Sequence, residues 1–562
     1  MKPAAANRRI AFLGLVFALL LGVALVRAFW IQVVHGSAYA AMAVRQHRET
    51  VVVAAGRGTI FDRNGEPLAI GEQMTTVYAN PRQITNPNQV TLDASRILGV
   101  DPEKTYQLLS DKSLGFVYVD RKGNPEKAAK LEKLDLPGLG FYPEELRTYP
   151  QDRIAAQVLG FAGTDNHGLE GLEKSLDPVL AGHPGSETIV KDPLGRALDV
   201  VSTKPATPGK SVRLTIDDQV QANAQDVIES TVRRFGAKSA TAIVMDPYTG
   251  DILAMAVAPG FNANRFATTR ADRHRNRAVT DMYEPGSTFK LVTISAALED
   301  GVVTPRSSFV LPPELHVADR VIHDAEARGT ERMSVRQIIE RSSNIGTVTI
   351  AEKLGASRLA AWVNRYGFGK PTGIDFPGES AGFALPLDQW SGSTIGTVPI
   401  GHGIAVTPLQ MARAYSAIAN GGILVQPHLI EKIDGRMVHH RRGHRVVSRS
   451  VSAQMMSMLR SVVLDGTGTE AALPGYTVAG KTGTAAKIDP DGRYSTSRYV
   501  ASFVGMVPAT KPQLVIMVMV DEPHASIWGG TVAAPAFQQI ARFDVQHLAI
   551  PPDAPKTAKS GY

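Results

Sequence analysis

The most apolar stretch of the chain lies at its N-terminus. It runs without interruption from Ile10 to Val26, is broken by Arg27, and resumes as far as Val34. Three basic residues precede it, Lys2, Arg8 and Arg9. One apolar segment of this length behind positive charges predicts a single membrane-spanning helix over residues 10–34, with residues 1–9 in the cytoplasm.

A cleaved signal peptide is the alternative interpretation of this N-terminus. The sequence AYA at residues 38–40 has the small-x-small pattern of a cleavage site. The apolar run is longer than the core of a usual signal peptide, and the candidate site lies well beyond it. We therefore expect an uncleaved anchor, with the remainder of the chain outside the inner membrane.

Behind the anchor, residues 35–205 show a mixed pattern. Short alternating runs such as ETVVVAA and TTVYAN predict strands, and the Asn-Gly pair in RGTIFDRNGEPLA predicts a tight turn between extended segments. No catalytic constellation stands out in this region. A structural, non-catalytic module is therefore the favoured interpretation.

The pattern changes near residue 206. An amphipathic stretch, QVQANAQDVIESTVRRF, predicts a helix, and two apolar runs separated by PYTGD predict a β-hairpin. Helical patterns dominate from Phe289 to about residue 420. Two more strands, YVASFVGMVP and QLVIMVMVDE, and a final helix follow, whereas residues 551–562 are typical of a disordered tail. Strands at both ends with helices between them predict an α+β domain over residues 206–550.

Composition narrows the classes of function. A chain of 562 residues is too long to fold around a single hydrophobic core, so we expect several domains. A composition of 44% apolar and 20% charged residues is typical of a globular protein. The absence of cysteine excludes thiol catalysis, disulfides and cysteine-based metal sites. A net charge of +7 is small for this length, so we expect no nucleic-acid partner.

Candidate chemistry appears in the segment EPGSTFKLV. Ser287 follows Pro285-Gly286 and precedes an apolar helical run, which places it near a helix N-terminus, with Pro285 in the first turn. Lys290 lies three residues later, on the same helix face, so its amine can reach the Ser287 hydroxyl. A lysine can accept the proton of a serine only when burial or a nearby positive charge lowers its pKa.

Two later motifs strengthen this weak signal. RSSNIG offers a second hydroxyl and an amide through Ser342 and Asn344, and AGKTGTA precedes the terminal strands. In the second motif, Lys481 supplies a positive charge, and Gly483 allows a ligand to approach the backbone of an edge strand.

Each of these features also has a simpler explanation. The serines and asparagine of SSN are good helix caps, and KTG alone is an ordinary turn. We expect Glu284 to act as a capping or dipole partner, and Glu173 to be structural, tying the N-terminal module to the anchor side. Gly529 and Gly530 are expected to mark a bulge or close packing. A solvated loop is expected at His439, His440 and His444.

The ordered trio of motifs resembles the penicillin-recognising serine enzymes, which are the D,D-transpeptidases, D,D-carboxypeptidases and serine β-lactamases. Further segments resemble the class B penicillin-binding proteins over most of residues 50–540. These segments are RGTIFDRNG, RTYPQ, GLEGLEKSLD, YEPGSTFK, GHGIAVTPLQMARAYSAIANGG, AGKTGTA and WGGTVAAPAF. The single anchor, the length and the lack of an appended C-terminal module are most similar to the division-specific transpeptidases of Gram-negative bacteria.

The resemblance implies a fold. It consists of an antiparallel sheet flanked by helices with a helical subdomain, behind a pedestal or dimerisation-like module at 35–205 and one transmembrane helix. It also implies site roles. Ser287 is the acylated nucleophile and Lys290 its base. Ser342 relays protons, while Asn344 holds the substrate amide. Lys481, Thr482 and Thr484 bind the substrate carboxylate, and the backbone N–H groups of Ser287 and Thr484 form the oxyanion hole.

The implied function is D,D-transpeptidation in septal wall synthesis, with no cofactor and no metal. The donor is a peptidoglycan stem peptide ending in D-Ala-D-Ala, and β-lactams mimic it. The expected location is the bacterial inner membrane, with the bulk of the chain in the periplasm. No polymerase motif is evident, so a SEDS-type glycan polymerase and other divisome membrane proteins are expected partners. The alternatives are a D,D-carboxypeptidase or β-lactamase-type hydrolase, and a non-catalytic β-lactam-binding division scaffold.

Overall fold

The computed structural model describes residues 3–37, 39, 48–191 and 197–554 of the chain. Contacts divide the chain into two compact units, residues 1–56 with 182–209 and residues 57–181 with 210–562. The first unit begins with helix α1 (Pro3–Phe29), which continues as a π-helical turn, η1 (Trp30–Val34). It also holds an antiparallel sheet of β1 (Arg48–Val53), β8 (Gly185–Lys191) and β9 (Ala197–Lys204).

The N-terminal helix is a candidate membrane span. The stretch Asn7–Val34 has a mean hydropathy of 2.5 over its most apolar window, and none of that window is buried. This agrees with the span predicted over residues 10–34. Ala38 and Ala40 of the alternative cleavage site lie outside the described residues.

In the second unit, a seven-stranded sheet combines segments from opposite ends of the chain. Its order is β21-β20-β10-β2-β3-β4, and β5 also pairs with β3. The strands are β2 (Ile60–Phe61), β3 (Pro67–Ala79), β4 (Val117–Gly123), β5 (Leu139–Thr148), β10 (Val212–Leu214), β20 (Ile430–Ile433) and β21 (Arg436–Met437). The downstream hairpin of β20 and β21 therefore completes a sheet that starts near residue 60.

Three short helices pack around β3–β5: α3 (Pro87–Leu98), α4 (Pro102–Ser110) and α5 (Pro125–Glu132). Each begins with proline directly behind a capping residue, whose side chain accepts a hydrogen bond from a backbone N–H of the first turn. Proline suits this position because its missing N–H would have no helical partner. The capping residues are Asn86, Asp101 and Asn124.

A buried ion network fastens the same part of the chain. The Glu173 carboxylate, fully buried, accepts from Arg57 Nε at 2.7 Å and from Arg147 Nε at 2.6 Å. Arg57 also bonds Asp177 at 2.6 Å. These contacts agree with the prediction that Glu173 is structural. All of the partners named here belong to the second unit, so these contacts do not tie the module to the anchor side as expected.

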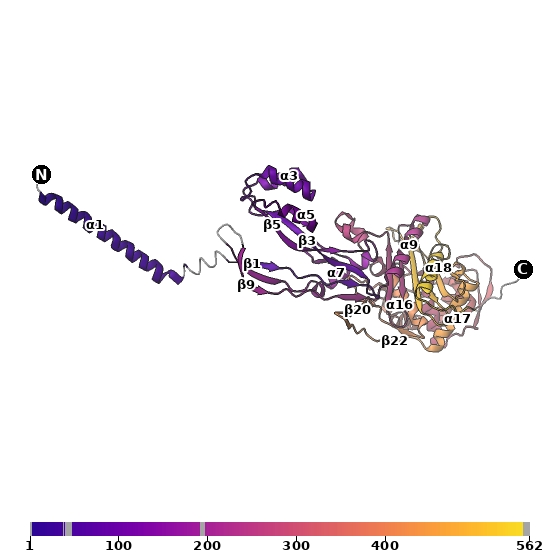
Figure 1. The fold of residues 1–562 in the computed structure, drawn as a ribbon. Helices are drawn as coiled ribbons and strands as arrows, with labels where there is room; N and C mark the ends of the chain where they lie inside the picture. The colour runs from indigo at the N-terminus through magenta and orange to yellow at the C-terminus, as the bar shows by residue number, and fades with distance from the viewer. Residues whose placement is uncertain (1–2, 38, 40–47, 192–196, 555–562) are drawn as a thin grey trace. The chain divides into compact units, whose positions relative to one another are not determined.

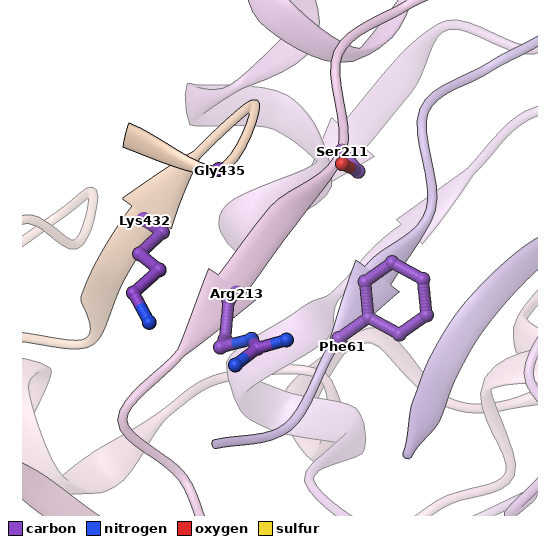
Figure 2. A pocket seen from close by; sticks show the side chains of 5 residues that line it. All are labelled: Phe61, Ser211, Arg213, Lys432 and Gly435. Atoms are coloured by element: carbon purple, nitrogen blue, oxygen red, sulfur yellow. The ribbon is translucent and has the colours of Figure 1, made fainter. Parts of the chain in front are cut away.

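A cavity of about 300 Å³ opens beside β10 (Figure 2). Arg213 of β10 pairs in register with Phe61 of β2 and with Lys432 of β20, so the three side chains stand in one row. Figure 2 shows the Arg213 side chain between the Lys432 amine and the Phe61 ring. The pairing places two cations side by side on adjacent strands.

The centre of the second unit is a five-stranded antiparallel sheet of order β12-β11-β25-β24-β23. Its strands are β11 (Ser239–Met245), β12 (Ile252–Ala258), β23 (Ala479–Ile488), β24 (Tyr494–Val507) and β25 (Leu514–Asp521). Both faces of β11 and β25 are buried, which explains their continuous apolar sequences. The predicted hairpin and terminal strands are present.

Helices cover both faces of this sheet (Figure 1). On one face, α9 (Asp218–Phe235) and α18 (Gly529–His547) pack against each other and the strands. The other face carries α16 (Pro408–Ala419) and α17 (Arg449–Leu464), and α11 (Lys290–Glu299) packs against α17. Apolar strand residues accordingly alternate between two cores, Ile243 in one and Val244 in the other.

The region between Phe289 and residue 420 is less helical than predicted. Besides α11, it contains α12 (Val335–Glu340), α13 (Asn344–Leu354) and α14 (Ala356–Arg365), but also short hairpins. These pair β13 (Ser308–Leu311) with β16 (Glu331–Ser334), and β14 (Leu315–Val317) with β15 (Arg320–Ile322). Strands of three or four residues are too short to give a clear alternating pattern.

The predicted disordered tail lies partly within the described residues. Asp553 accepts hydrogen bonds from the backbone N–H and hydroxyl of Thr477 and from Thr510. Residues 551–554 are therefore ordered, which corrects the start of the predicted tail. Residues 555–562 lie outside the described part of the chain.

Candidate active site

Ser287 lies in a tight turn that leads into α11. Pro285 precedes a 3-10 turn over Gly286–Phe289, and the α-helix starts at Lys290, so Pro285 is the residue before the helix rather than part of its first turn. Gly286 has φ +54°, a conformation that glycine adopts readily, and its N–H donates to Gly401 O at 3.1 Å. This turn leaves Ser287 half-buried, between buried neighbours on both sides.

Lys290 is completely buried, and its amine faces the SSN segment. The Nζ atom lies 2.5 Å from Ser342 O, 3.2 Å from Ser342 Oγ and 2.8 Å from Asn344 Oδ1. Within the described chain, none of its hydrogen bonds is to Ser287, so the expected contact to Ser287 is replaced by contacts to the SSN segment at the start of α13. The three predicted residues Lys290, Ser342 and Asn344 are thus brought together.

The pKa of Lys290 is well below its ordinary value. Burial is the main cause, because it disfavours the charged amine. The positive charge of Lys481 lowers this pKa further, whereas the carboxylate of Asp324 raises it. The expectation that burial and Lys481 favour a neutral Lys290 agrees with these directions.

The SSN segment is both a helix cap and part of the candidate site, the two interpretations that the sequence left open. Ser343 is the N-cap of α13, and its Oγ accepts from Gly346 N at 3.0 Å. Ser342 and Asn344 flank this cap, and both contact Lys290. Ser342 has φ +59°, so the chain reverses there and exposes its carbonyl oxygen to the Lys290 amine.

Sequence reasoning missed Asp324, which supports this segment from behind. Its carboxylate accepts from Ser343 Oγ at 3.0 Å and from Ile345 N at 3.0 Å, and it pairs with Arg328 Nε at 2.7 Å. Asp324 therefore holds the start of α13 in place and puts a negative charge near Lys290.

Lys481 is buried in β23, with its Nζ 3.3 Å from Thr482 Oγ1 and 3.5 Å from Thr467 Oγ1. The two threonine hydroxyls lie 2.7 Å apart. Burial lowers the pKa of Lys481 to about 7. Thr467, which the sequence did not single out, thus belongs to the same polar group as Lys481 and Thr482.

Strand β23 passes close to the Ser287 turn. A Cβ at Gly483 would lie 2.4 Å from Ser502 Oγ and 3.0 Å from Pro285 O, and a Cβ at Gly286 would lie 3.1 Å from Thr484 O. The start of α18 packs equally closely: a Cβ at Gly529 would lie 2.3 Å from Gly483 O. Close packing is therefore the role of Gly529, as expected, and its N–H donates to Thr484 Oγ1 at 3.0 Å.

Glu284 does not cap the helix, contrary to expectation. Its carboxylate pairs with His402 Nδ1 at 2.7 Å and accepts from Gly403 N at 2.8 Å and from Tyr494 OH at 3.2 Å. The reason is that the chain reverses at Pro285–Gly286, so Glu284 lies before the turn and faces the loop of residues 401–403.

The histidine-rich loop differs in one position from the prediction. His439 and His444 are exposed, but His440 is half-buried and stacks on His428 with ring centroids 3.6 Å apart. In the described part of the chain, no group of three or more histidine, cysteine, aspartate or glutamate side chains is arranged to hold a metal ion.

Two family models match the chain. Residues 240–542 match the penicillin binding protein transpeptidase domain, and residues 52–214 match the penicillin-binding protein dimerisation domain. The chain therefore belongs to the penicillin-binding proteins that carry a transpeptidase domain, and the predicted family and fold class are confirmed.

Individual relatives extend over nearly the whole chain. The peptidoglycan D,D-transpeptidase FtsI of Escherichia coli is 33% identical and covers 98% of this chain and 95% of its own. Penicillin-binding protein PbpB of Mycolicibacterium smegmatis is 34% identical over 94% of this chain and 88% of its own. Penicillin-binding protein 3 of Mycobacterium tuberculosis, solved in complex with aztreonam, is 32% identical with a TM-score of 0.72 over 91% of this chain and all of its own.

Proposed function

We propose that the chain is a membrane-anchored serine D-Ala-D-Ala transpeptidase that cross-links peptidoglycan stem peptides through an acyl-enzyme on Ser287. The activity is that of its relatives of similar length, such as FtsI of Escherichia coli. The single observation that carries the role of this site is the environment of Lys290: a fully buried amine, bonded to Ser342 and Asn344, next to a second buried lysine.

The first half of the reaction needs a base, and a neutral Lys290 can act as one. In this role it takes the proton of Ser287 as the hydroxyl attacks the carbonyl carbon of the penultimate D-Ala. A neutral amine has two hydrogens and one lone pair. Ser342 O and Asn344 Oδ1 can accept these two hydrogens, which leaves the lone pair for the proton of Ser287. The protonated amine then donates its third hydrogen to Ser342 Oγ. Ser342 can then pass a proton to the leaving amine of the terminal D-Ala.

The remaining site residues act on the substrate's charges. The backbone N–H groups of Ser287 and Thr484 stabilise the oxyanion of the tetrahedral intermediate. Lys481, Thr482 and Thr484 bind the terminal carboxylate, and Gly483 lets the peptide approach β23 closely. Because the Lys481 pKa is about 7 in the free site, an arriving carboxylate favours its charged form.

Localisation and partners follow from the same assignment. Residues 1–9 lie in the cytoplasm, residues 10–34 cross the inner membrane, and the non-catalytic module at 35–205 and the transpeptidase domain at 206–550 lie in the periplasm. β-Lactams acylate Ser287 as mimics of the donor. A SEDS-type polymerase, together with other divisome membrane proteins, supplies the glycan strands that the enzyme cross-links in the septal wall.

Labelling with a fluorescent penicillin tests the nucleophile. The wild type is expected to form a covalent adduct that survives denaturation, and Ser287→Ala is expected to form none. Equal labelling of both would overturn the role of Ser287. Cross-linking of a D-Ala-D-Ala donor to an amine acceptor then separates the transpeptidase from a hydrolase, which releases only the hydrolysed donor, and from a silent scaffold, which releases neither product.

A further inference from the structure

A carboxylate–imidazole pair lies beside the Ser287 turn and has no part in the acylation chemistry above. Glu284 stands three residues before Ser287, and His402 belongs to the loop of residues 401–403. This loop touches the turn directly, because Gly286 N donates to Gly401 O at 3.1 Å and a Cβ at Gly401 would lie 2.2 Å from Gly286 O. The pair is thus fixed to the backbone that carries Ser287.

The geometry of the pair sets its proton state. His402 Nδ1 lies 2.7 Å from Glu284 Oε2, and since an ionised carboxylate can only accept, the proton of a neutral imidazole resides on Nδ1. The Nε2 atom then carries the lone pair. Among the hydrogen bonds of the described residues, none involves His402 Nε2. A carboxylate that orients an imidazole in this way is the usual arrangement of a general base.

The surroundings leave the pair accessible. The Glu284 and His402 side chains are 12% and 26% exposed. In the described part of the chain, no lysine or arginine forms an ion pair with Glu284. The third member of the group, Tyr494 of β24, donates to Glu284 Oε1 at 3.2 Å and meets the His402 ring edge-on at 5.3 Å. Arg320 acts electrostatically on Tyr494, whereas the Glu284 carboxylate is the group that faces His402. The site is therefore partly exposed, carries a carboxylate and is lined by one aromatic ring, which suits a primary ammonium group.

We propose that the Glu284–His402 pair binds and deprotonates the acceptor amine of the cross-linking reaction. This rests on the proposed function, in which the amine of a neighbouring stem peptide resolves the acyl-enzyme. An alkyl amine arrives protonated at neutral pH, because its pKa is near 10, and it cannot attack in that form. The negative charge of Glu284 attracts the ammonium, and imidazole is the side chain that most often acts as a general base.

The ammonium loses two protons during this step. His402 Nε2 takes one proton from the ammonium, and the freed amine nitrogen attacks the ester carbonyl carbon of acyl-Ser287. The new C–N bond forms as the C–Oγ bond breaks. The second proton of the amine passes through Lys290 and Ser342 to Ser287 Oγ, and His402 releases its proton to water. Acylation of Ser287 by the donor does not need the pair.

The experiment compares the two halves of the reaction in the full-length enzyme. An acyl donor ending in D-Ala is supplied with a primary amine acceptor, and the ratio of aminolysis to hydrolysis products is measured beside the rate of acylation by fluorescent penicillin. The variants are His402→Asn, which removes the base, and Glu284→Gln, which keeps an oxygen for Gly403 N. His444→Asn, at an exposed position on β22 (His444–Arg445), is the matched control.

We expect both variants to lower the aminolysis-to-hydrolysis ratio at least about tenfold, with the acylation rate changed much less, because general bases contribute about a hundredfold or more. The control keeps the wild-type ratio. If aminolysis and acylation fall in proportion, the pair only holds the turn in place and the proposal is wrong; an unchanged ratio also overturns it. Failure of the proposed function is distinguishable, since the wild type itself would then give either no acyl-enzyme or only hydrolysed donor.

Discussion

The Nζ of Lys290 lies 2.8 Å from the Oδ1 of Asn344, although 54 residues separate the two in the chain. The contact joins the first turn of α11 to the first turn of α13. It has a chemical consequence, because a buried amine that is held by neutral oxygens and faces another cation is kept in its basic form.

The pH dependence of acylation is expected to move in opposite directions in two variants. In the proposed mechanism acylation needs neutral Lys290, so its rate is expected to fall as pH drops through the Lys290 pKa. Asp324 raises this pKa and Lys481 lowers it. Asp324→Asn should therefore shift the acid limb to lower pH, and Lys481→Met should shift it to higher pH. The measurement is the second-order rate constant for a fluorescent penicillin across pH. Asp319→Asn, at an exposed acid five residues before Asp324, should leave the limb in place.

The stability of the protein is expected to depend on pH through Lys481. Its folded pKa is about 7, below the value of 10.5 that it has when exposed. Between these values the unfolded chain binds more protons, so stability rises with pH over this window. Lys481→Met should raise the free energy of unfolding below pH 7 by at most on the order of 5 kcal/mol, and this gain should vanish toward pH 10.5. Melting temperatures of the variant and the wild type across pH measure the gain. A gain that does not change with pH would contradict this origin.

The buried ion network should be far more sensitive than the surface pairs of the same module. Glu173→Ala leaves the guanidinium groups of Arg57 and Arg147 buried without their shared carboxylate. We expect a loss of about 3–5 kcal/mol in the free energy of unfolding.

The matched control is Asp165→Asn at the exposed end of its ion pair with Arg121. Surface pairs contribute at most about 1 kcal/mol. Urea denaturation of the two variants compares these values directly, and equal losses would contradict the assigned role of burial.

Because Gly529 is closely packed, we expect the Gly529→Ala variant to react more slowly with penicillin. The added methyl group would overlap Gly483 O and Ser502 O, so the start of α18 must move away from β23 and release Thr484 Oγ1. We expect slower acylation by penicillin and a lower melting temperature. Gly329→Ala, where a Cβ meets nothing within 4 Å, is expected to behave as the wild type, and similar behaviour of both variants would refute the packing argument.

The sequence was sufficient to predict site residues that belong to motifs and strands that are apolar along their whole length. Ser287, Lys290, the SSN segment and β23–β25 belong to this group. Other members of the site were not predictable, because their importance arises from position alone. Asp324 lies in an irregular loop after a three-residue strand, and Thr467 lies between glycines, where threonine is common. Only the folded chain brings these polar residues to α13 and β23.

For Glu284, the local sequence predicted a contact that the structure does not contain. Its place before Pro285-Gly286 is typical of a helix start, and local rules alone favour a capping role. The structure instead directs it across the turn to His402, which follows 118 residues later. Local patterns describe contacts within an element, whereas this contact depends on how two elements meet.

The SSN tripeptide has two structural roles within one turn of the chain. The Ser343 side chain caps helix α13, and the side chains of Ser342 and Asn344 contact Lys290. A substitution here that slows attack by an antibiotic would also disturb either the helix start or the turnover of the natural donor. Populations under β-lactam selection should therefore accumulate tolerated changes around this tripeptide rather than inside it.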